Sequence, residues 1–315
     1  MRNCLFTIFG GTGFIGRYVV QRLADRGARI LVISRSPRTR GLHLQPLGAV
    51  NQIVVQGTDL DDEAALRRTV AGASGVINLI GILYETGRQP FAEVHGALPG
   101  RIAAAASAEG VPRLVHVSAI GADPNSTSAY ARSKAEGERR VRVAFPAATI
   151  LRPSIVIGPE DGFFNRFANL ARFLPALPLI GGGKTRFQPV YVGDVAQAVV
   201  AALERDDCQG QTYELGGPKA YTFEELMRYM LQVVDRRRLL VNVPFGLANL
   251  LARFLELLPE PPLTRDQVEL LKYDNVVTPG TPGFDALGIT PTPIELIVPD
   301  YLALYRPGPA RVRSA

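Results

Sequence analysis

The sequence predicts an α/β protein built on a doubly wound parallel sheet, with a smaller mixed lobe that follows it. In the first half, short and nearly continuous apolar runs alternate with stretches of helical periodicity, the pattern of parallel strands covered on both faces. A glycine-rich turn directly follows the first apolar run. In the second half the alternation weakens and proline becomes more frequent, which favours a less regular lobe.

The elements of the first half can be placed in order. The expected strands are residues 4–9, 29–34, 52–56, 75–80, 114–118 and 148–151. The expected helices are residues 14–26, 63–71, 92–109 and 128–143. Strands that alternate with helices in this way form a parallel sheet, and its ligand lies beyond the carboxyl ends of the strands.

The second half is divided between the two parts. Residues 187–192, 195–204 and 212–215 are expected to return to the sheet as strand, helix and strand. The predicted division gives residues 1–161 and 187–217 to the sheet domain, 162–186 and 218–306 to the smaller lobe, and 307–315 to a mobile tail.

Composition excludes several classes of protein. Of the 315 residues, 47% are hydrophobic and 20% are charged, a globular balance that excludes wholesale disorder. The 35 Lys and Arg against 29 Asp and Glu give a net charge of +6. The arginines are scattered, however, and Arg236-Arg237-Arg238 is the only basic run, so the sequence does not support nucleic-acid binding.

No metal site and no membrane span are expected. Cys4 and Cys208 lack metal or disulfide spacing, which fits a reducing compartment, and the three histidines lie far apart. The longest apolar stretch, residues 239–258, is interrupted by polar residues and proline, and strand-like residues begin almost at the first residue, where a signal sequence would lie.

The glycine-rich turn predicts a dinucleotide site. Glycines at positions 10, 13 and 16 between a strand and a helix would give a tight turn, a close backbone approach to a pyrophosphate, and close helix–strand packing. The helix N-terminus then offers free N–H groups to the phosphates. The expected contact residues are Gly10, Thr12, Gly13, Phe14, Ile15 and Gly16.

The end of the second strand selects the cofactor. An acidic residue there would bind the ribose 2′-OH of NAD(H), whereas an arginine accommodates the 2′-phosphate of NADP(H). Arg35 stands there, with Arg38 and Arg40 close behind and no acid among them, so the sequence favours NADP(H). Asp59 and Leu60, after the third strand, would reach the adenine edge; Asp59 could equally cap the next helix.

Tyr130 and Lys134 lie four residues apart on one expected helical face, and Ser118 ends a strand twelve residues before Tyr130. In such a triad the lysine ammonium favours an ionised phenol and binds the nicotinamide ribose. The phenol then exchanges a proton with a substrate oxygen that the serine hydrogen-bonds. The further residues expected to contact the cofactor are Asn78, Gly81, Pro153 and Ile155.

Two apolar stripes occur at helical spacing, in residues 163–174 and 247–258. Both are expected to pack into the core of the smaller lobe. The alternative is that they contact a membrane surface or another subunit.

The glycine turn and the triad residues Ser118, Tyr130 and Lys134 resemble the short-chain dehydrogenase/reductase superfamily, in its extended form with a C-terminal lobe. The later segments are similar to one atypical branch, the nucleotide-binding accessory subunits of respiratory complex I of the alpha subcomplex subunit 9 type. These segments are residues 116–122, 151–161, 163–167, 188–195 and 266–277. The resemblance covers nearly the whole chain.

This resemblance implies a tightly held NADPH that serves structure or assembly rather than a catalytic cycle. It also implies a place among the hydrophilic-arm subunits of complex I near the membrane, with a peripheral membrane contact. The location would be the cytoplasmic face of a bacterial inner membrane, or the matrix side if the chain is organellar. His95 departs from the asparagine expected in catalytic extended members, which puts a proton relay at that position in doubt.

The sequence leaves a second function open. A free-standing NADPH-dependent reductase or epimerase would use Tyr130 as acid and base, with Lys134 and Ser118 assisting. An intact triad is necessary for this chemistry and does not by itself establish it.

Overall fold

The computed structural model describes residues 1–87 and 89–307, so the predicted tail, apart from its first residue, lies outside the described residues. The chain forms two compact units. The first consists of Met1–Pro153, Val192–Leu215 and Val277–Thr290. The second consists of Ser154–Tyr191, Gly216–Val276 and the described residues from Pro291 onward.

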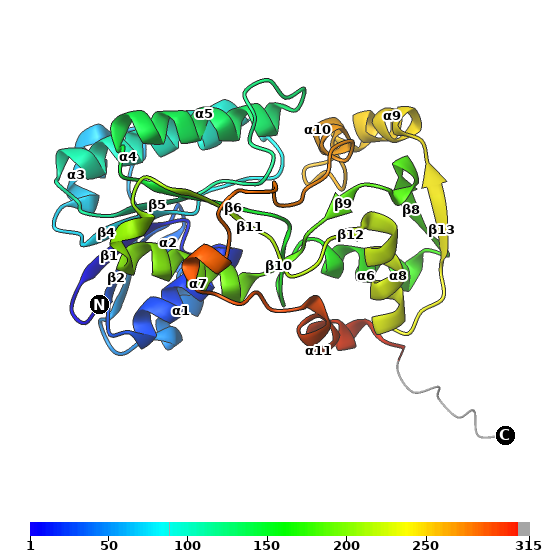
Figure 1. Ribbon diagram of the computed structural model, residues 1–315, viewed down its shortest axis with the longest axis horizontal. Coiled ribbons are helices and arrows are strands. Elements are labelled where there is room, and N and C mark those ends of the chain that lie inside the picture. The colour runs from blue at the N-terminus through cyan, green and yellow to red at the C-terminus, as the bar shows by residue number, and fades with distance from the viewer. Residues whose placement is uncertain (88, 308–315) are drawn as a thin grey trace. The chain divides into compact units, whose positions relative to one another are not determined.

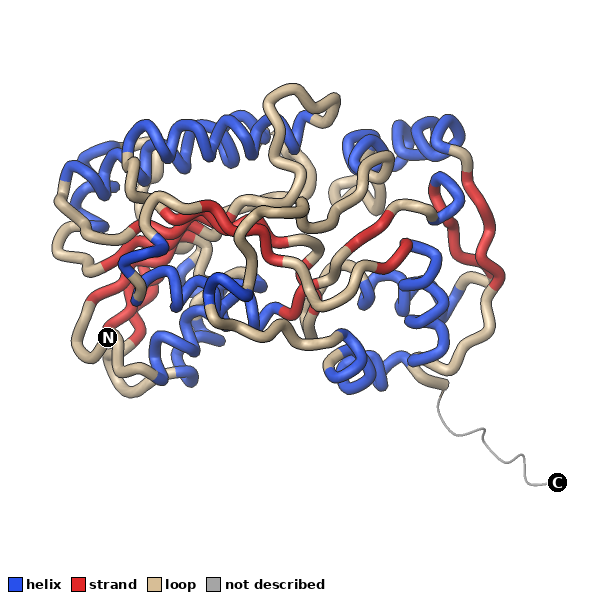
Figure 2. Tube along the Cα trace, viewed as in Figure 1, coloured by secondary structure: helices blue, strands red, loops and turns tan. Residues whose placement is uncertain are grey.

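A seven-stranded parallel sheet forms the centre of the first unit, and it confirms the predicted fold class. In spatial order its strands are β11 (Thr212–Leu215), β6 (Thr149–Pro153), β5 (Leu114–Val117), β4 (Gly75–Asn78), β1 (Leu5–Phe9), β2 (Arg29–Ile33) and β3 (Ile53–Gln56). Figure 2 shows these strands in red, with helices above and below them.

Helices cover both faces of this sheet. Figure 1 shows α1 (Phe14–Asp25) and α7 (Val192–Glu204) together on one face. The other face carries α3 (Glu63–Val70), α4 (Leu98–Ala108) and α5 (Ala129–Ala144), which pack side by side. The short α2 (Pro37–Arg40) follows β2.

The core beneath α3, α4 and α5 is built from apolar side chains of the strands and of the helices that cover them. Phe9, Leu66, Ile102 and Leu114 are almost completely buried there and belong to one cluster. Each such side chain contributes about 1.5–3 kcal/mol of apolar burial relative to exposure. This packing holds the strands in register, so that their carboxyl ends, and the loop residues that follow them, lie at one edge of the sheet.

The strand order reverses between β1 and β4. From β1 the chain moves outward through β2 to β3, and it then returns to β4 on the other side and continues through β5 and β6 to β11. In open α/β sheets, a reversal of this kind leaves a crevice at the carboxyl ends of the two neighbouring strands. The glycine-rich turn after β1 lies at this reversal.

The second unit contains three two-stranded sheets and five helices within the described residues. Its strands pair as β7 (Val156–Ile157) with β10 (Val190–Tyr191), β9 (Arg186–Phe187) with β12 (Tyr221–Thr222), and β8 (Ala176–Ile180) with β13 (Leu239–Val243). Its helices are α6 (Phe164–Phe173), α8 (Phe223–Val233), α9 (Phe245–Leu255), α10 (Arg265–Leu270) and α11 (Val298–Leu302).

The first apolar stripe packs into the core of this unit, as predicted. Phe164, Ala168 and Ala171 of α6 are completely buried and contact the apolar face of α8, including Met227 and Met230. Phe163 and its neighbours add a cluster of edge-to-face ring contacts.

The second apolar stripe, residues 247–258, does not pack into the core of this unit, and the prediction that it does is wrong. α9 buries its alanine face instead: Ala248 and Ala252 pack against Ile180 and Val268. Small side chains let the helix lie close to its neighbours, which leaves the larger ones on the outer face. The exposed residues are Leu247, Leu250, Leu251, Phe254 and Leu258.

Candidate functional site

The glycine turn has the shape that its spacing predicts. Gly10 adopts a φ of +82°, and a Cβ there would lie 3.0 Å from the backbone of Leu79 and Ile80, which follow β4. A Cβ on Gly16 would lie 2.5 Å from the Gly10 carbonyl oxygen. Only glycine fits these two positions, because the loops after β1 and β4 and the first turn of α1 meet there.

The N-terminus of α1 is open to a ligand. Gly13 is the residue that caps the helix, so no side chain accepts a hydrogen bond from the first N–H groups, and the first turn holds no acidic residue. Its own amide donates to the Gly10 carbonyl at 3.0 Å, which closes the turn. Thr12, Phe14 and Ile15 are partly exposed around it. The unpaired N–H groups and the helix dipole both favour a phosphate here.

Arg35 and Arg38 are exposed at the end of β2. Ser34 before them is buried, and its Oγ accepts a hydrogen bond from the Ser36 amide at 3.3 Å, which fixes the start of this loop. No acidic side chain in the described part of the chain pairs with Arg35 or Arg38, so both cations are available to an anion at this sheet edge.

Asp59 does not cap the next helix, which corrects that alternative. Its Oδ1 accepts a hydrogen bond from the Asp61 amide at 3.0 Å, while Asp62 is the N-cap of α3 and accepts from Ala64 at 2.9 Å. Leu60 is half-buried, and Arg101 donates to its carbonyl. A hollow of about 290 Å³ opens beside this loop, lined by Gln56, Gly57, Thr58, Asp59, Ala65, Arg68 and Thr69.

Tyr130 and Lys134 lie on one face of α5, as predicted. The Lys134 ammonium is 5.9 Å from the centre of the Tyr130 ring, and a Cβ on Gly81 would lie 3.5 Å from Nζ. Lys134 is only 5% exposed, and burial lowers its pKa from 10.5 to about 8, against a smaller raising effect of Glu138. No described residue accepts a hydrogen bond from this buried ammonium, so it is available to a ligand.

His95 is held as a neutral imidazole. Its Nε2 accepts a hydrogen bond from the Ile82 amide at 3.0 Å, so the ring proton lies on Nδ1, which donates to Ser133 Oγ at 3.2 Å. Ser133 donates in turn to the Tyr130 carbonyl at 2.7 Å. Burial, the Lys134 charge and His116 lower the pKa of His95 to about 2.

The backbone around His95 is unusual. Residues Ala92–Ala97 form a π-helical turn directly before α4, a rare geometry that is frequently found at functional sites. The His95 ring stacks on Phe91 at a centroid distance of 5.2 Å and meets the Tyr130 ring edge-on at 5.1 Å. Sequence reasoning named His95 only for its departure from asparagine; the π-helical turn left no pattern that could have placed it.

Asn78 and His116 form a second buried pair at the ends of β4 and β5. Asn78 Oδ1 accepts from the Ile80 amide at 3.1 Å, so its amide nitrogen donates to His116 Nδ1 at 3.2 Å. The His116 proton is therefore on Nε2, a buried atom with no hydrogen-bond partner in the described structure. Burial and the Lys134 charge lower the pKa of His116 to about 3.

Ser118 follows His116 by two residues and is 4% exposed. Its Oγ is also buried without a hydrogen-bond partner among the described residues. Pro153 is buried at the end of β6, and its carbonyl accepts from Ile120 at 3.0 Å. Ile155 is half-buried and belongs to the second unit.

The residues present fit a dinucleotide. An open helix N-terminus and a loop without room for Cβ atoms suit a pyrophosphate. An unpaired ammonium and an unpaired serine hydroxyl suit a ribose and a carbonyl oxygen or amide, because buried polar groups are normally hydrogen-bonded. Within residues 1–87 and 89–307 no group of three or more metal-ligating side chains is found.

Comparison with known proteins decides the family. The model of the NAD dependent epimerase/dehydratase family matches residues 6–216. The chain belongs to this family. Its members bind a nicotinamide dinucleotide, which agrees with the geometry of the glycine turn.

Close relatives match over almost the full chain. NADH dehydrogenase [ubiquinone] 1 alpha subcomplex subunit 9 of Mus musculus is 38% identical over 95% of this chain and 80% of its own length. The Arabidopsis thaliana protein of the same name is 38% identical over 96% and 78%. These matches confirm the predicted resemblance to the complex I accessory subunits.

Solved structures agree in fold. An NADPH-dependent quinone oxidoreductase from Escherichia coli superimposes with a TM-score of 0.73 at 21% identity, over 96% of this chain and 100% of that one. At this identity the similarity shows the extended two-part fold alone.

Proposed function

We propose that this protein is an NADP(H)-binding accessory or assembly subunit of respiratory NADH:quinone oxidoreductase, in which the dinucleotide is retained and mainly structural. The names of the mouse and plant relatives support the role in complex I. A further relative with 35% identity over 95% of this chain is the 40 kDa subunit of NADH-ubiquinone oxidoreductase of Neurospora crassa. The glycine turn at the strand reversal supports the dinucleotide.

The observation that carries a retained cofactor is the state of His95. Both ring nitrogens of His95 are already engaged, by Ile82 and Ser133, and its pKa of about 2 keeps it neutral. It therefore has no free position through which a proton could pass from the buried Lys134 ammonium. A nicotinamide ring supplies hydride chemistry when bound; here the side chains around it hold and orient it.

Each residue has a proposed part in binding. The α1 N-terminus binds the pyrophosphate, and Asp59 and Leu60 lie at the adenine. Lys134 and Tyr130 hydrogen-bond the nicotinamide ribose, Asn78 and Gly81 line it, and Ser118 and Pro153 face the nicotinamide. The preference for NADP(H) rests on Arg35, which is exposed and unpaired by any acid in the described chain, as a 2′-phosphate partner.

The proposed place is peripheral, on the hydrophilic arm next to the membrane. This corresponds to the cytoplasmic side of a bacterial inner membrane, or to the matrix side in an organelle. Among the described helices none has the length and apolarity that a membrane span requires. A peripheral attachment would use the other subunits of the complex, with the exposed leucines of α9 as a candidate contact.

One observation favours a second function. Ser118 Oγ is a buried hydroxyl without a partner, as a site that orients a substrate oxygen requires. A Ceramide reductase of Caulobacter vibrioides is 33% identical over 75% of this chain. The alternative is therefore an NADPH-dependent reductase or epimerase with a Ser118-Tyr130-Lys134 triad.

Isolation from native membranes distinguishes the two functions. We expect the full chain to co-purify with complex I subunits and to release NADP(H) on denaturation. Tyr130→Phe, which removes the acid–base hydroxyl and keeps the ring contacts, should leave this co-purification unchanged. A protein found alone in the soluble fraction, with exchangeable cofactor and a turnover that Tyr130→Phe abolishes, would establish the alternative.

A further inference from the structure

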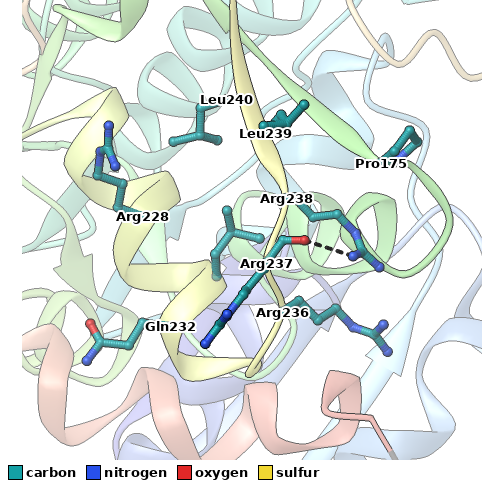
Figure 3. Close-up of a pocket in the computed structure, with 9 residues that line it drawn as sticks. Pro175, Arg228, Gln232, Arg236, Arg237, Arg238, Leu239 and Leu240 are labelled. Carbon is teal, nitrogen blue, oxygen red and sulfur yellow. Dashed lines mark hydrogen bonds between the residues drawn. The ribbon is translucent and has the colours of Figure 1, made fainter.

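An arginine-lined hollow of about 610 Å³ opens in the second unit, between α8 and the start of β13 (Figure 3). The residues that line it include four arginines and no acid. They are Pro175, Arg228, Leu231, Gln232, Arg236, Arg237, Arg238, Leu239 and Leu240. Asp235, the nearest acid in sequence, forms no ion pair with any residue that the structure describes.

Two of these arginines are fixed without being neutralised. Arg236 Nε donates to the Tyr305 carbonyl at 3.0 Å, and Arg238 Nε donates to the Ala171 carbonyl at 2.8 Å. Backbone carbonyls carry no net charge, so both guanidinium groups keep their full positive charge. Their positions are set before any ligand arrives, which lowers the entropy lost on binding.

Arg237 and Arg228 differ from this pair. The side chain of Arg237 is exposed and makes no hydrogen bond or ion pair with a described residue, although its carbonyl accepts from Arg238 Nη1 at 2.9 Å, the dashed line of Figure 3. Arg228 is paired with Glu224 at 2.6 Å. Three consecutive arginines without an ionic partner therefore lie at one rim of the hollow.

We infer that this hollow binds a phosphate or phosphodiester group. Guanidinium groups present fixed forks of N–H donors that match phosphate oxygens, and three adjacent cations repel one another until an anion neutralises them. This site belongs to the second unit and is separate from the dinucleotide site. The phosphate comes from an anionic phospholipid headgroup or from a soluble phosphate ester. Leu239 and Val241, 71% and 48% exposed on one face of β13, offer apolar surface beside the arginines.

Arg237→Gln tests the site, because its side chain holds no other part of the fold. Arg29→Gln is the matched control: Arg29 is exposed in the first unit, has no side-chain partner among the described residues, and its loss changes the net charge equally. All measurements use the full chain loaded with NADPH and freed of excess nucleotide by gel filtration, so that the dinucleotide site is filled and no free NADPH competes for the hollow. Circular dichroism melts establish that both variants remain folded.

Two arms distinguish the sources of phosphate. Isothermal titration with glycerol 3-phosphate reports a soluble ester, and flotation with phosphatidylglycerol against phosphatidylcholine vesicles reports a headgroup. We expect binding in at least one arm, weakened about tenfold by Arg237→Gln and unchanged by Arg29→Gln, as for the loss of one charge-assisted contact. Absence of binding in both arms, or equal weakening by the two substitutions, would overturn the inference. Neither result bears on complex I co-purification.

Discussion

Gly137 of α5 packs directly against the backbone carbonyl of His95, and no Cβ fits between them. This approach brings the helix that carries Tyr130 and Lys134 against the π-helical turn. Gly137→Ala gains helix propensity of about 1 kcal/mol but must displace that carbonyl, and overpacking typically costs about 1–3 kcal/mol. We expect a lower melting temperature and weaker NADPH binding.

Gly246→Ala is the control for this prediction. Gly246 lies in α9, where a Cβ would meet nothing within 4 Å, so alanine there should leave stability unchanged or raise it. Equal effects of the two substitutions would show that the Gly137 contact does not constrain α5.

Arg35→Asp tests the cofactor preference. A carboxylate at the end of β2 repels a 2′-phosphate and accepts from a 2′-hydroxyl, so NADPH affinity should fall by about tenfold or more while NADH affinity changes little. Fluorescence titration with both nucleotides measures the difference. Equal loss for both nucleotides would remove the argument for a 2′-phosphate site at Arg35.

Dinucleotide affinity should fall as the pH rises through 8. The pKa of Lys134 is about 8 because the ammonium is buried, and in the proposed complex the ammonium form of Lys134 binds the ribose. Above that pH the affinity should drop by up to about tenfold per pH unit, as one proton is required. Lys134→Gln should bind weakly at every pH, and an unchanged wild-type affinity between pH 7 and 9 would contradict the assignment.

Acid should destabilise the fold through two histidines. The pKa values of His95 and His116 are lowered from 6.5 to about 2 and about 3, so below pH 6.5 the unfolded chain binds protons that the folded chain does not. The free energy of unfolding therefore decreases as the pH is lowered below 6.5, by about 1.4 kcal/mol per pH unit for each histidine. Urea unfolding at pH 7 and 5 measures this, and His95→Gln should remove about half of the slope.

Substitutions at Asp59 and Asp62 should affect different properties, dinucleotide binding for Asp59 and stability for Asp62. Asp62→Ala removes the N-cap of α3 and should cost about 1 kcal/mol of stability with little effect on the nucleotide. Asp59→Ala should leave the melting temperature nearly unchanged, because this side chain closes only a local turn, and should weaken dinucleotide binding at the adenine end. The reverse pattern would exclude Asp59 from the site.

The sequence was sufficient for the parallel sheet and for the glycine turn, because buried parallel strands leave short, nearly continuous apolar runs and the glycine spacing is typical of a phosphate-binding turn. The positions of Gly10 and Gly16 followed from spacing alone. Tyr130 and Lys134 shared a face because a helix has a fixed period. These features depend on residues that are close together in the sequence, so they can be predicted from it.

Other features depended on packing between distant residues. The hydrogen bonds of His95 to Ile82 and Ser133 arise from the π-helical turn, which has no recognisable pattern. The leucines of α9 resembled a core stripe, and only the tertiary structure shows that the alanine face is the buried one. Asp59 was a plausible cap in the sequence, but the structure begins α3 at Glu63, so that Asp62 is the N-cap.

Because of the π-helical turn at Ala92–Ala97, the position of His95 depends on the exact number of residues in this segment. A π-turn takes one more residue than an α-turn to cover the same distance, so deleting a single residue from this segment would permit an ordinary α-helix. The segment before the deletion would then rotate by about 100° relative to α4, as each α-helical residue does. Helix content would survive, while the imidazole would lose its contacts with α5.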